Sequence, residues 1–228
     1  MPSFAISDIH GCSQTFTALL DKIAFSKSDS LYLLGDYIDR GPDSKGVIDL
    51  ILKMKEEGYH VYCLRGNHEQ MMLDGLTDNI KKQTWVMAGG KNALLSFGVD
   101  DLSQIPERYI DFLHQLEYYF EADGYILVHA GLSFWETGRL EDKKSMLWSR
   151  SWYNDIDYKW LGERIIIHGH TPQTRMESDA QLASIQTQRY LNIDNGCVFA
   201  HRVRGMDMGN LLAFDMTNQV LYSVANID

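Results

Sequence analysis

The sequence predicts an α/β fold with two central mixed β-sheets flanked by helices. Three observations predict it: short apolar runs recur along the first two thirds of the chain, each run ends in polar residues, and amphipathic segments of helix length separate them. Such runs are typical of strands that are covered on both faces. Strands that alternate with helices in this way indicate an α/β fold.

The individual elements follow from these patterns in chain order. We expect strands where the apolar runs lie, at residues 4–6, 31–34, 60–64, 125–128 and 165–167. Amphipathic spacing predicts helices at residues 14–23, 44–57, 69–76 and 106–116. The last third instead shows strand-like segments joined by turns, at residues 191–194, 210–215 and 220–224. Thr217 and Asn218 form the expected hairpin turn between the last two.

Length and composition set further limits. The 228 residues fit one domain, for which we take the whole span 1–228, because no linker or internal repeat interrupts it. The net charge of −10 argues against a broad nucleic-acid footprint or an anionic membrane surface. No apolar run approaches the ~20 residues that cross a bilayer. Three scattered cysteines make no disulfide framework, so we expect a reducing, cytoplasmic location.

Five polar motifs carry the chemistry, and each closes a predicted strand. In chain order they begin at Asp8 (DIHG), Gly35 (GDYIDRG), Arg65 (RGNHE), His129 (HAG) and Gly169 (GHTP). Strand ends are where an open α/β sheet normally builds its site. The mixture of carboxylate, imidazole and amide groups suits a pair of Mn, Fe or Zn ions better than Ca or Mg alone. Two such ions activate water against a phosphate ester.

The residue types suggest how two ions would be held. A carboxylate has two oxygens, so Asp36 can bridge both metals. Asp8 and His10 offer further ligands to the first ion, and Asn67, His129 and His170 complete the second. His168, two residues before His170, is a weaker candidate, and a structural role for it is favoured over metal binding.

Four residues are candidates for direct work on the phosphate. His68 follows Asn67 and suits a general acid that protonates the departing oxygen. Asp39 can orient His68 by a hydrogen bond and raise its pKa. Arg40 and Arg150 are candidates for the phosphate oxygens, because a guanidinium offers two parallel donors.

An aromatic stretch and the cysteines leave alternatives open. Residues 148–160 carry five aromatic side chains near Arg150, which form either a substrate groove or ordinary surface packing. A cysteine-dependent phosphatase would need Cys-x5-Arg, and Cys197 has Val203 at the required place. A non-catalytic scaffold is disfavoured as well, because every candidate metal ligand and the candidate acid are present.

The motifs resemble those of the phosphoprotein phosphatase family of metallophosphoesterases. More narrowly, residues 65–76 (RGNHEQMMLDGL), 147–150 (LWSR) and 168–172 (HGHTP) resemble the small bacterial and phage branch typified by the lambda phosphatase. The resemblance runs from Ser7 to about Ala200, with Ser7 standing where the family usually has Gly. It implies a single calcineurin-like domain with the metallophosphoesterase sandwich, a dinuclear, Mn-activated site, and direct attack by a metal-bridging water or hydroxide. The metal ligands, acid pair and arginines that it implies are those given above.

Two enzyme functions are consistent with the resemblance. The leading expectation is a metal-dependent serine/threonine protein phosphatase, with phosphotyrosine as a further substrate and phosphoproteins or phosphopeptides as partners. The alternative is a symmetrical bis(5'-nucleosyl)-tetraphosphatase that hydrolyses diadenosine tetraphosphate. That substrate requires a purine-stacking surface, for which the sequence offers no motif. Fold and metal site alone do not choose between them.

Overall fold

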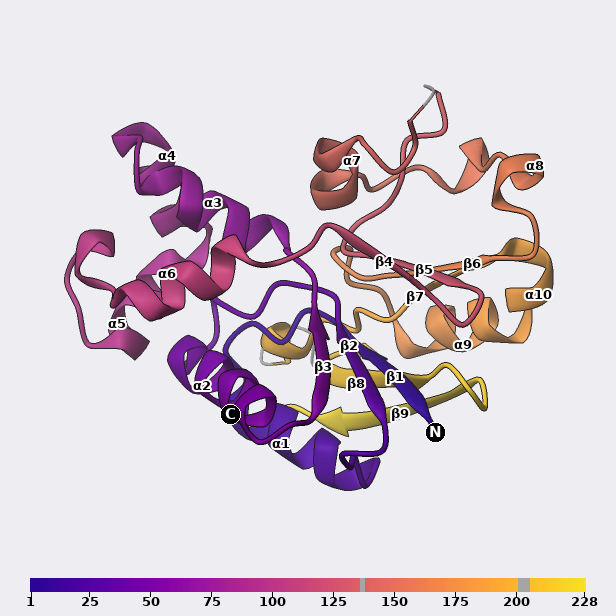
Figure 1. Cartoon of the computed structure of the whole chain (residues 1–228), viewed down its shortest axis with the longest axis horizontal. Helices are drawn as coiled ribbons and strands as arrows, with labels where there is room; N and C mark the ends of the chain where they lie inside the picture. The colour runs from indigo at the N-terminus through magenta and orange to yellow at the C-terminus, as the bar shows by residue number, and fades with distance from the viewer. Residues whose placement is uncertain (136–137, 201–205) are drawn as a thin grey trace.

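The computed structural model describes residues 1–135, 138–200 and 206–228. Within them, two β-sheets lie face to face and helices cover their outer faces (Figure 1). The predicted α/β fold with two mixed sheets flanked by helices is therefore confirmed. Val203, which argued against a cysteine nucleophile, lies outside the described residues.

The first sheet has five strands, β1 (Ser3–Ile6), β2 (Ser30–Leu33), β3 (His60–Cys63), β8 (Asn210–Asp215) and β9 (Val220–Ala225). Their order is β3-β2-β1-β8-β9, with β1 to β3 parallel and β8 antiparallel to both of its neighbours. The predicted hairpin joins β8 to β9. Asp215 closes its turn, because one carboxylate oxygen accepts from the backbone N–H groups of both Thr217 and Asn218.

The second sheet has four strands, β4 (Tyr119–Ala122), β5 (Tyr125–Val128), β6 (Ile165–His168) and β7 (Tyr190–Asn192), in that order. β5, β6 and β7 are parallel, and β4 pairs antiparallel with β5. β4 was not predicted from the sequence. It lies at the edge of the sheet and its side chains are only partly buried or exposed, so it has no continuous apolar run.

Helices complete the outer layers (Figure 1). Against the first sheet lie α1 (Ser13–Lys22) and α2 (Ser44–Glu56). Four more form a lobe beside that sheet, α3 (Asn67–Gly75), α4 (Asn79–Trp85), α5 (Lys91–Phe97) and α6 (Glu107–His114). The second sheet is covered by α7 (Lys143–Trp148) and α8 (Tyr158–Leu161), while α9 (Arg175–Ala183) and α10 (Ile185–Gln188) follow β6. Short helical turns occupy Val86–Gly90, Leu102–Gln104, Tyr153–Asp155 and Cys197–Phe199.

The alternation of side chains in β1 shows how the layers are divided. Phe4 and Ile6 belong to the apolar cluster beneath the helices of the first sheet, whereas Ala5 belongs to the cluster between the two sheets. A third cluster joins the second sheet to α7 and α8 through Ile126 and Met146. Burying one such aliphatic side chain contributes roughly 1.5–3 kcal/mol. The two sheets therefore form a firm base for the loops at their strand ends.

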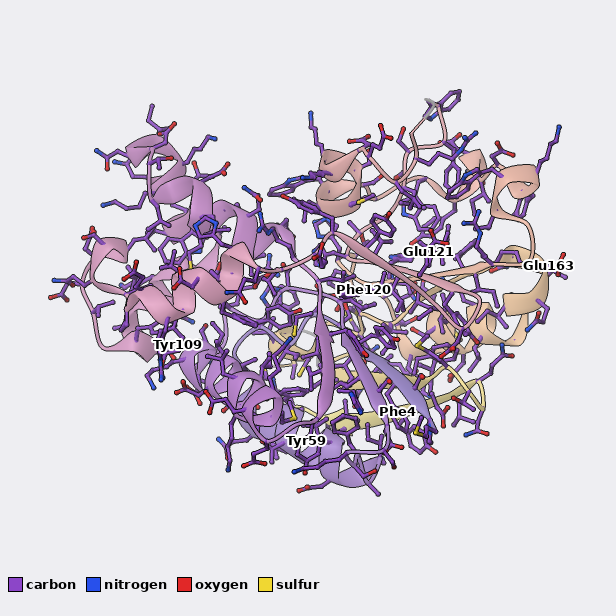
Figure 2. The ribbon with its side chains drawn as sticks, in the orientation of Figure 1. Phe4, Tyr59, Tyr109, Phe120, Glu121 and Glu163 are labelled. Carbon is purple, nitrogen blue, oxygen red and sulfur yellow. The ribbon has the colours of Figure 1, made fainter. Side chains whose placement is uncertain are left out.

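Side chains fill the space between the layers (Figure 2). No helix in the described part of the chain is long and apolar enough to cross a membrane. The three cysteines are buried and free.

Candidate metal centre

The five polar motifs meet where the strands of both sheets end. His129, which directly follows β5 of the second sheet, places its Nδ1 2.8 Å from the carbonyl oxygen of Leu34, which follows β2 of the first sheet. One hydrogen bond thus ties the two sheets together at the centre. The six predicted metal ligands are at most 5% exposed; they are Asp8, His10, Asp36, Asn67, His129 and His170.

The backbone around the centre is strained. Non-glycine residues rarely adopt positive φ, and each instance disfavours folding by about 1–3 kcal/mol. Six of the predicted site residues do so, with φ between 46° and 73°: Asp8, His10, Asp36, Asp39, Arg40 and His170. Such strain clusters at functional sites, where the surrounding structure holds it in place.

Backbone carbonyls fix the orientation of two imidazole rings. Nδ1 of His10 lies 2.8 Å from the carbonyl oxygen of Ile38, and Nδ1 of His129 lies at the same distance from that of Leu34. A carbonyl oxygen can only accept, so each Nδ1 carries the proton. In the neutral ring, Nε2 then keeps its lone pair and faces the centre, which is the arrangement found in metal-ligating histidines.

Potential metal-ligand atoms converge around Nε2 of His129. Its Nε2 lies 3.1 Å from Asn67 Oδ1, 3.2 Å from His170 Nδ1 and 3.5 Å from Asp36 Oδ1. The other ring nitrogen of His170, Nε2, is buried without a hydrogen-bond partner. Acceptor atoms so close together repel one another unless a proton or a metal cation lies among them. The chemistry of these four groups therefore fits a divalent ion.

A second convergence lies on the other side of Asp36. Its Oδ2 lies 3.3 Å from His10 Nε2 and 4.0 Å from His68 Nε2. Arg40 Nη1 reaches to 2.7 Å of the same His10 nitrogen, so a cationic group already lies against that lone pair. Asp8 lies next to His170, whose backbone N–H donates to its Oδ2 over 2.9 Å. Within the described residues, the His10/Asp36/His68 and Asp36/His129/His170 groups each keep their ligand atoms within 4.8 Å.

The electrostatics agree with a cation site. Burial alone would raise the pKa of Asp36, but the neighbouring imidazoles of His129, His68 and His10 hold it well below its usual range. Burial lowers the pKa of His170 to about 2. Asp36 therefore stays ionised and His170 stays neutral, and these are the protonation states that metal binding requires.

His68 and Asp39 form the predicted pair. Nδ1 of His68 lies 2.6 Å from Asp39 Oδ2, and both side chains are buried. The expectation that Asp39 raises the pKa of His68 is wrong, because burial lowers it to about 3. Burial also raises the pKa of Asp39 well above its usual range. An anionic phosphate beside Nε2 would raise the pKa of His68 again, since it favours the charged ring.

Trp85 supports this pair and was missed in the sequence. Its indole Nε1–H donates to both oxygens of Asp39, over 3.1 and 2.9 Å, from the fully buried end of α4. Gly90 packs against the indole ring, where a Cβ atom would clash with it. No sequence pattern marks this contact, because Trp85 lies 46 residues from Asp39 in a helix too short to show clear periodicity.

Glu69 is a second residue that the sequence reasoning missed. Its carboxylate is fully buried and accepts from the backbone N–H groups of Asp36, Tyr37 and Gly66 over 2.8–2.9 Å. It therefore fixes the loop that carries Asp36 to the start of α3, which carries Asn67. The available signal was its place at the third position of α3, where a glutamate typically caps the preceding backbone.

The two predicted phosphate ligands differ in how they are held. Arg40 is partly buried, its backbone N–H donates to Gly89, and its guanidinium lies 5.3 Å from the ring of Phe199. Arg150 is exposed and makes two long contacts, 3.3 Å to the carbonyl oxygen of His170 and 3.4 Å to the hydroxyl of Thr171. Both arginines lie beside predicted metal ligands, but only Arg40 has a firmly packed side chain.

The aromatic stretch at residues 148–160 does not form a continuous groove. Trp152 is only 3% exposed, and its indole N–H donates to the carbonyl oxygen of Ala130. It packs against His168, whose Nε2 lies 3.2 Å from the hydroxyl of Tyr153. His168 thus belongs to this aromatic packing and to neither candidate metal group. Trp148 alone remains exposed next to the centre, with 42% of its surface accessible.

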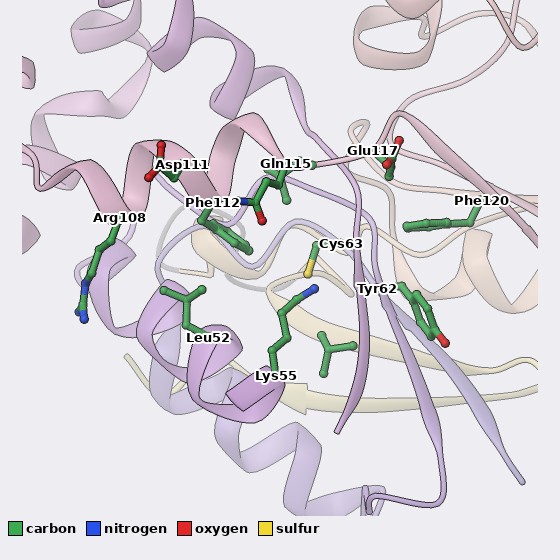
Figure 3. Close-up of a pocket in the computed structure, with 12 residues that line it drawn as sticks. Leu52, Lys55, Tyr62, Cys63, Arg108, Asp111, Phe112, Gln115, Glu117 and Phe120 are labelled. Carbon is green, nitrogen blue, oxygen red and sulfur yellow. The ribbon is translucent and has the colours of Figure 1, made fainter. Parts of the chain in front are cut away.

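A hollow of about 350 Å³ lies elsewhere, between α2, α6 and the edge strands β3 and β4 (Figure 3). Its lining mixes apolar side chains with charges of both signs, such as Lys55, Arg108 and Asp111. It contains none of the predicted site residues. Cys63 lines it as well, and burial raises the pKa of that thiol to about 11, so it is not a reactive thiolate.

Comparison with known families identifies the chain. The profile of the calcineurin-like phosphoesterase family matches residues 1–204, which include all of the predicted site residues. The chain belongs to this family. Membership makes it a metallophosphoesterase and a hydrolase, and implies a dinuclear centre of divalent metal ions for which the two His/Asp groups are the candidates. The sheets and helices agree with the fold of the family.

Individual relatives point to one substrate class. A symmetrical bis(5'-nucleosyl)-tetraphosphatase of Nitrosomonas europaea is 35% identical over 133 residues, which cover 58% of this chain and 45% of the relative. The chain therefore matches less than half of that relative's length. An asymmetrical bis(5'-nucleosyl)-tetraphosphatase of Bacillus velezensis is 26% identical over 223 residues, 88% of this chain and 86% of the relative.

A solved structure extends the comparison of folds. A protein serine/threonine phosphatase of Saccharomyces cerevisiae superposes with a TM-score of 0.69 at 14% identity, over 100% of this chain and 81% of that one. This likeness shows the fold alone.

The relatives correct the leading expectation. Those just described from sequence are named for dinucleoside tetraphosphates, so the expected protein phosphatase function and the phosphoprotein partner are wrong. Motifs around a metal centre determine how a phosphoryl group is bound, and not which group carries it. They therefore do not identify the substrate. The narrower resemblance to the lambda phosphatase branch is not shown by these relatives either.

Proposed function

We propose that this protein hydrolyses dinucleoside tetraphosphates such as diadenosine tetraphosphate. The observation that carries the proposal is the naming of its sequence relatives, among them one that aligns with 88% of the chain. The strain, burial and converging ligands of the centre support hydrolysis at phosphorus. Relatives of both the symmetrical and the asymmetrical type are similar to the chain, so the products decide where the phosphate bridge is cut.

The proposed metal ligands combine the sequence motifs with the two convergences around Asp36, in which Asp8 takes no part and His68 stands beside His10. In the proposal Asp8, His10 and Asp36 would hold a first ion, and Asp36, Asn67, His129 and His170 would hold a second. Asp36 suits the bridging role because its Oδ1 faces His129 and its Oδ2 faces His10. Mixed oxygen and nitrogen ligands suit Mn, Fe or Zn, and Mn is the ion we propose to test first. Bound ions would supply activated water and stabilise the negative charge that develops on the phosphate.

Side chains of the protein bind the phosphate and supply the proton. Arg40 and Arg150 bind oxygens of the phosphate under attack and orient it, because a guanidinium donates two parallel hydrogen bonds. Asp39, held by Trp85, orients the ring of His68 so that Nε2 faces the centre. His68 then gives a proton to the oxygen that leaves.

The leaving group decides how much His68 contributes. In a dinucleoside tetraphosphate the leaving group is a nucleoside phosphate, and phosphate groups of this kind have a pKa of about 6. A nucleoside phosphate can therefore leave without a full proton transfer. An alkoxide that leaves from an alkyl phosphate is far more basic and requires that proton. The lowered pKa of His68 is therefore compatible with a phosphoanhydride substrate.

The test is product analysis. The Mn-loaded protein is incubated with diadenosine tetraphosphate, and the nucleotides are separated by anion-exchange chromatography. Two ADP molecules indicate symmetrical cleavage, and AMP with ATP indicates asymmetrical cleavage. The Asp36→Ala variant and a chelator-treated sample serve as blanks. Release of nucleotides no faster than in these blanks would refute the proposal.

A further inference from the structure

Trp148 is an exposed aromatic residue at the centre to which the mechanism above gives no role. The residue is 42% exposed, and its ring centroid lies 6.3 Å from that of the predicted ligand His170, edge to face. A tryptophan side chain carries a large apolar surface that proteins normally cover. An exposed one beside a candidate metal ligand is therefore a candidate for contact with a ligand.

The position of Trp148 is fixed by its neighbours. Met146 is buried in the apolar cluster on the outer face of the second sheet, and Leu147 is buried as well. The backbone N–H of Ala130, next to His129, donates to the carbonyl oxygen of Met146 over 2.8 Å. The end of α7 is thus docked onto the loop that carries a predicted metal ligand. This docking leaves the indole ring of Trp148 facing outward.

The surroundings of Trp148 combine an aromatic ring with basic side chains and one aspartate. A hollow of about 370 Å³ is lined by Trp148, Lys144, Ser145, Ser149 and Asp142. Lys144 is exposed, and Arg150 lies two residues beyond Trp148 with its guanidinium near Thr171. The lining carries one charge of each sign, Asp142 and Lys144, and Arg150 adds a second positive group next to it. Aromatic rings beside basic groups are the combination that binds bases attached to phosphates.

We infer that Trp148 stacks on one purine base of the substrate, while the attached phosphates extend past Arg150 to the metal centre. The inference rests on the proposed function and adds to it the stacking surface that a dinucleotide requires. It makes Trp148 a specificity-determining residue. The metal centre acts on phosphorus in any ester, whereas the indole ring recognises a flat base.

Kinetics on two substrates test the inference. Inorganic tripolyphosphate has the same phosphoanhydride bond as diadenosine tetraphosphate but no base. Stacking on an aromatic side chain is worth about a tenfold change in binding. Trp148→Ala should therefore lower kcat/KM for diadenosine tetraphosphate about tenfold, mainly through KM, and at least about fivefold more than for tripolyphosphate. Trp148→Phe, which keeps an aromatic ring, should recover most of the loss.

Tyr158→Ala is the matched control. Tyr158 is 50% exposed in the same aromatic stretch, and its hydroxyl donates to Gln188, away from the centre. Its removal should leave both substrates unaffected. Equal losses on both substrates for Trp148→Ala would overturn the inference, because they would indicate a general disturbance of the centre.

A binding measurement separates this inference from the proposed function. A methylene-bridged analogue of diadenosine tetraphosphate, which is not hydrolysed, should quench the tryptophan fluorescence of the wild type and of Tyr158→Ala. Trp148→Phe should lose that quenching, and quenching that persists would overturn the inference. If quenching depends on Trp148 but the wild type does not cleave diadenosine tetraphosphate, the proposed function fails and the base-binding site stands.

Discussion

The interior of the centre and its rim are built in opposite ways. In the interior, Asp36 and His129 are at most 1% exposed. The ring of His129, after the second sheet, contacts the carboxylate of Asp36 and the carbonyl oxygen of Leu34, which follow a strand of the first sheet. At the rim, Arg150 and Trp148 are exposed, and Arg150 has only contacts of 3.3 and 3.4 Å. The interior is therefore preorganised, and the rim can adapt to what binds.

The difference between the buried interior and the exposed rim indicates that catalysis depends on the interior and substrate specificity on the rim. Preorganised groups stabilise the charge that develops at phosphorus without having to rearrange. That charge is the same in a phosphoserine and in a nucleotide, so the interior does not choose between them. Selection between substrates therefore depends on the rim, whose side chains contact the group attached to the phosphate. Changes in the interior should thus affect every substrate, and changes at the rim should affect substrates unequally.

The largest effect is expected from Asp36→Ala. Removing the carboxylate between the two ligand groups should abolish hydrolysis of all substrates. The loss should exceed the factor of about 10²–10⁴ that follows removal of a general acid. Metal analysis should give fewer than two ions per chain. Glu163→Ala, at a carboxylate on the surface (Figure 2), is the control and should retain both ions. Two ions in Asp36→Ala would contradict the bridging role.

The next effect is expected from His68→Asn, which keeps a donor to Asp39. The variant should lose about 10²–10⁴-fold in kcat on phenyl phosphate, whose leaving group needs a proton. The loss should be smaller on p-nitrophenyl phosphate and on diadenosine tetraphosphate, whose leaving groups depart more easily. Steady-state kinetics on the three substrates measures this order. A loss of the same size on all three would remove His68 as the proton donor.

A smaller effect is expected from Trp85→Phe. The change deletes the N–H that donates to both oxygens of buried Asp39, which destabilises the fold by about 1–3 kcal/mol. It should also lower kcat on phenyl phosphate about tenfold, because Asp39 then orients His68 less well.

Trp152→Phe is the control for Trp85, since Trp152 is also buried and donates to a backbone carbonyl. Urea unfolding should show similar destabilisation of both variants. Only Trp85→Phe should lose more rate on phenyl phosphate than on p-nitrophenyl phosphate. The same dependence on the leaving group in both variants would make Trp85 purely structural.

The smallest effect is expected at the rim, from Arg150→Lys. A lysine keeps the charge but not the two parallel donors. Because the site is exposed, KM should rise only about two- to fivefold with little change in kcat. Arg164→Lys, at a surface ion pair with Glu121, should change neither. A fall in kcat as large as that of His68→Asn would show that Arg150 acts like an interior residue, and would contradict the distinction between interior and rim.

Much of the fold and the centre could be predicted from the sequence, because both depend on local patterns. The apolar runs predicted β1, β2, β3, β5 and β6, and the polar residues that follow them did converge as expected for strand ends. The edge strand β4 and the short helices α4 and α5 were missed. Each has too few residues, or too little burial, to show a periodicity.

The missed site residues depend on contacts between distant parts of the chain. Glu69 accepts from Asp36 and Tyr37, which lie more than 30 residues earlier, and Trp85 reaches Asp39 only because α4 folds back. The pKa of His68 was predicted in the wrong direction, since its burial outweighs its neighbouring carboxylates and no sequence pattern reports burial of that extent. The substrate was also predicted wrongly, because the motifs describe the interior and specificity lies at the rim.

The most direct test of the account compares two substrates side by side. The measurement is kcat/KM of the Mn-loaded protein on diadenosine tetraphosphate and on a phosphoserine peptide at equal metal concentration. We expect the dinucleotide to be preferred by at least about tenfold, a difference of about 1.4 kcal/mol in transition-state binding. A preference for the peptide would contradict it.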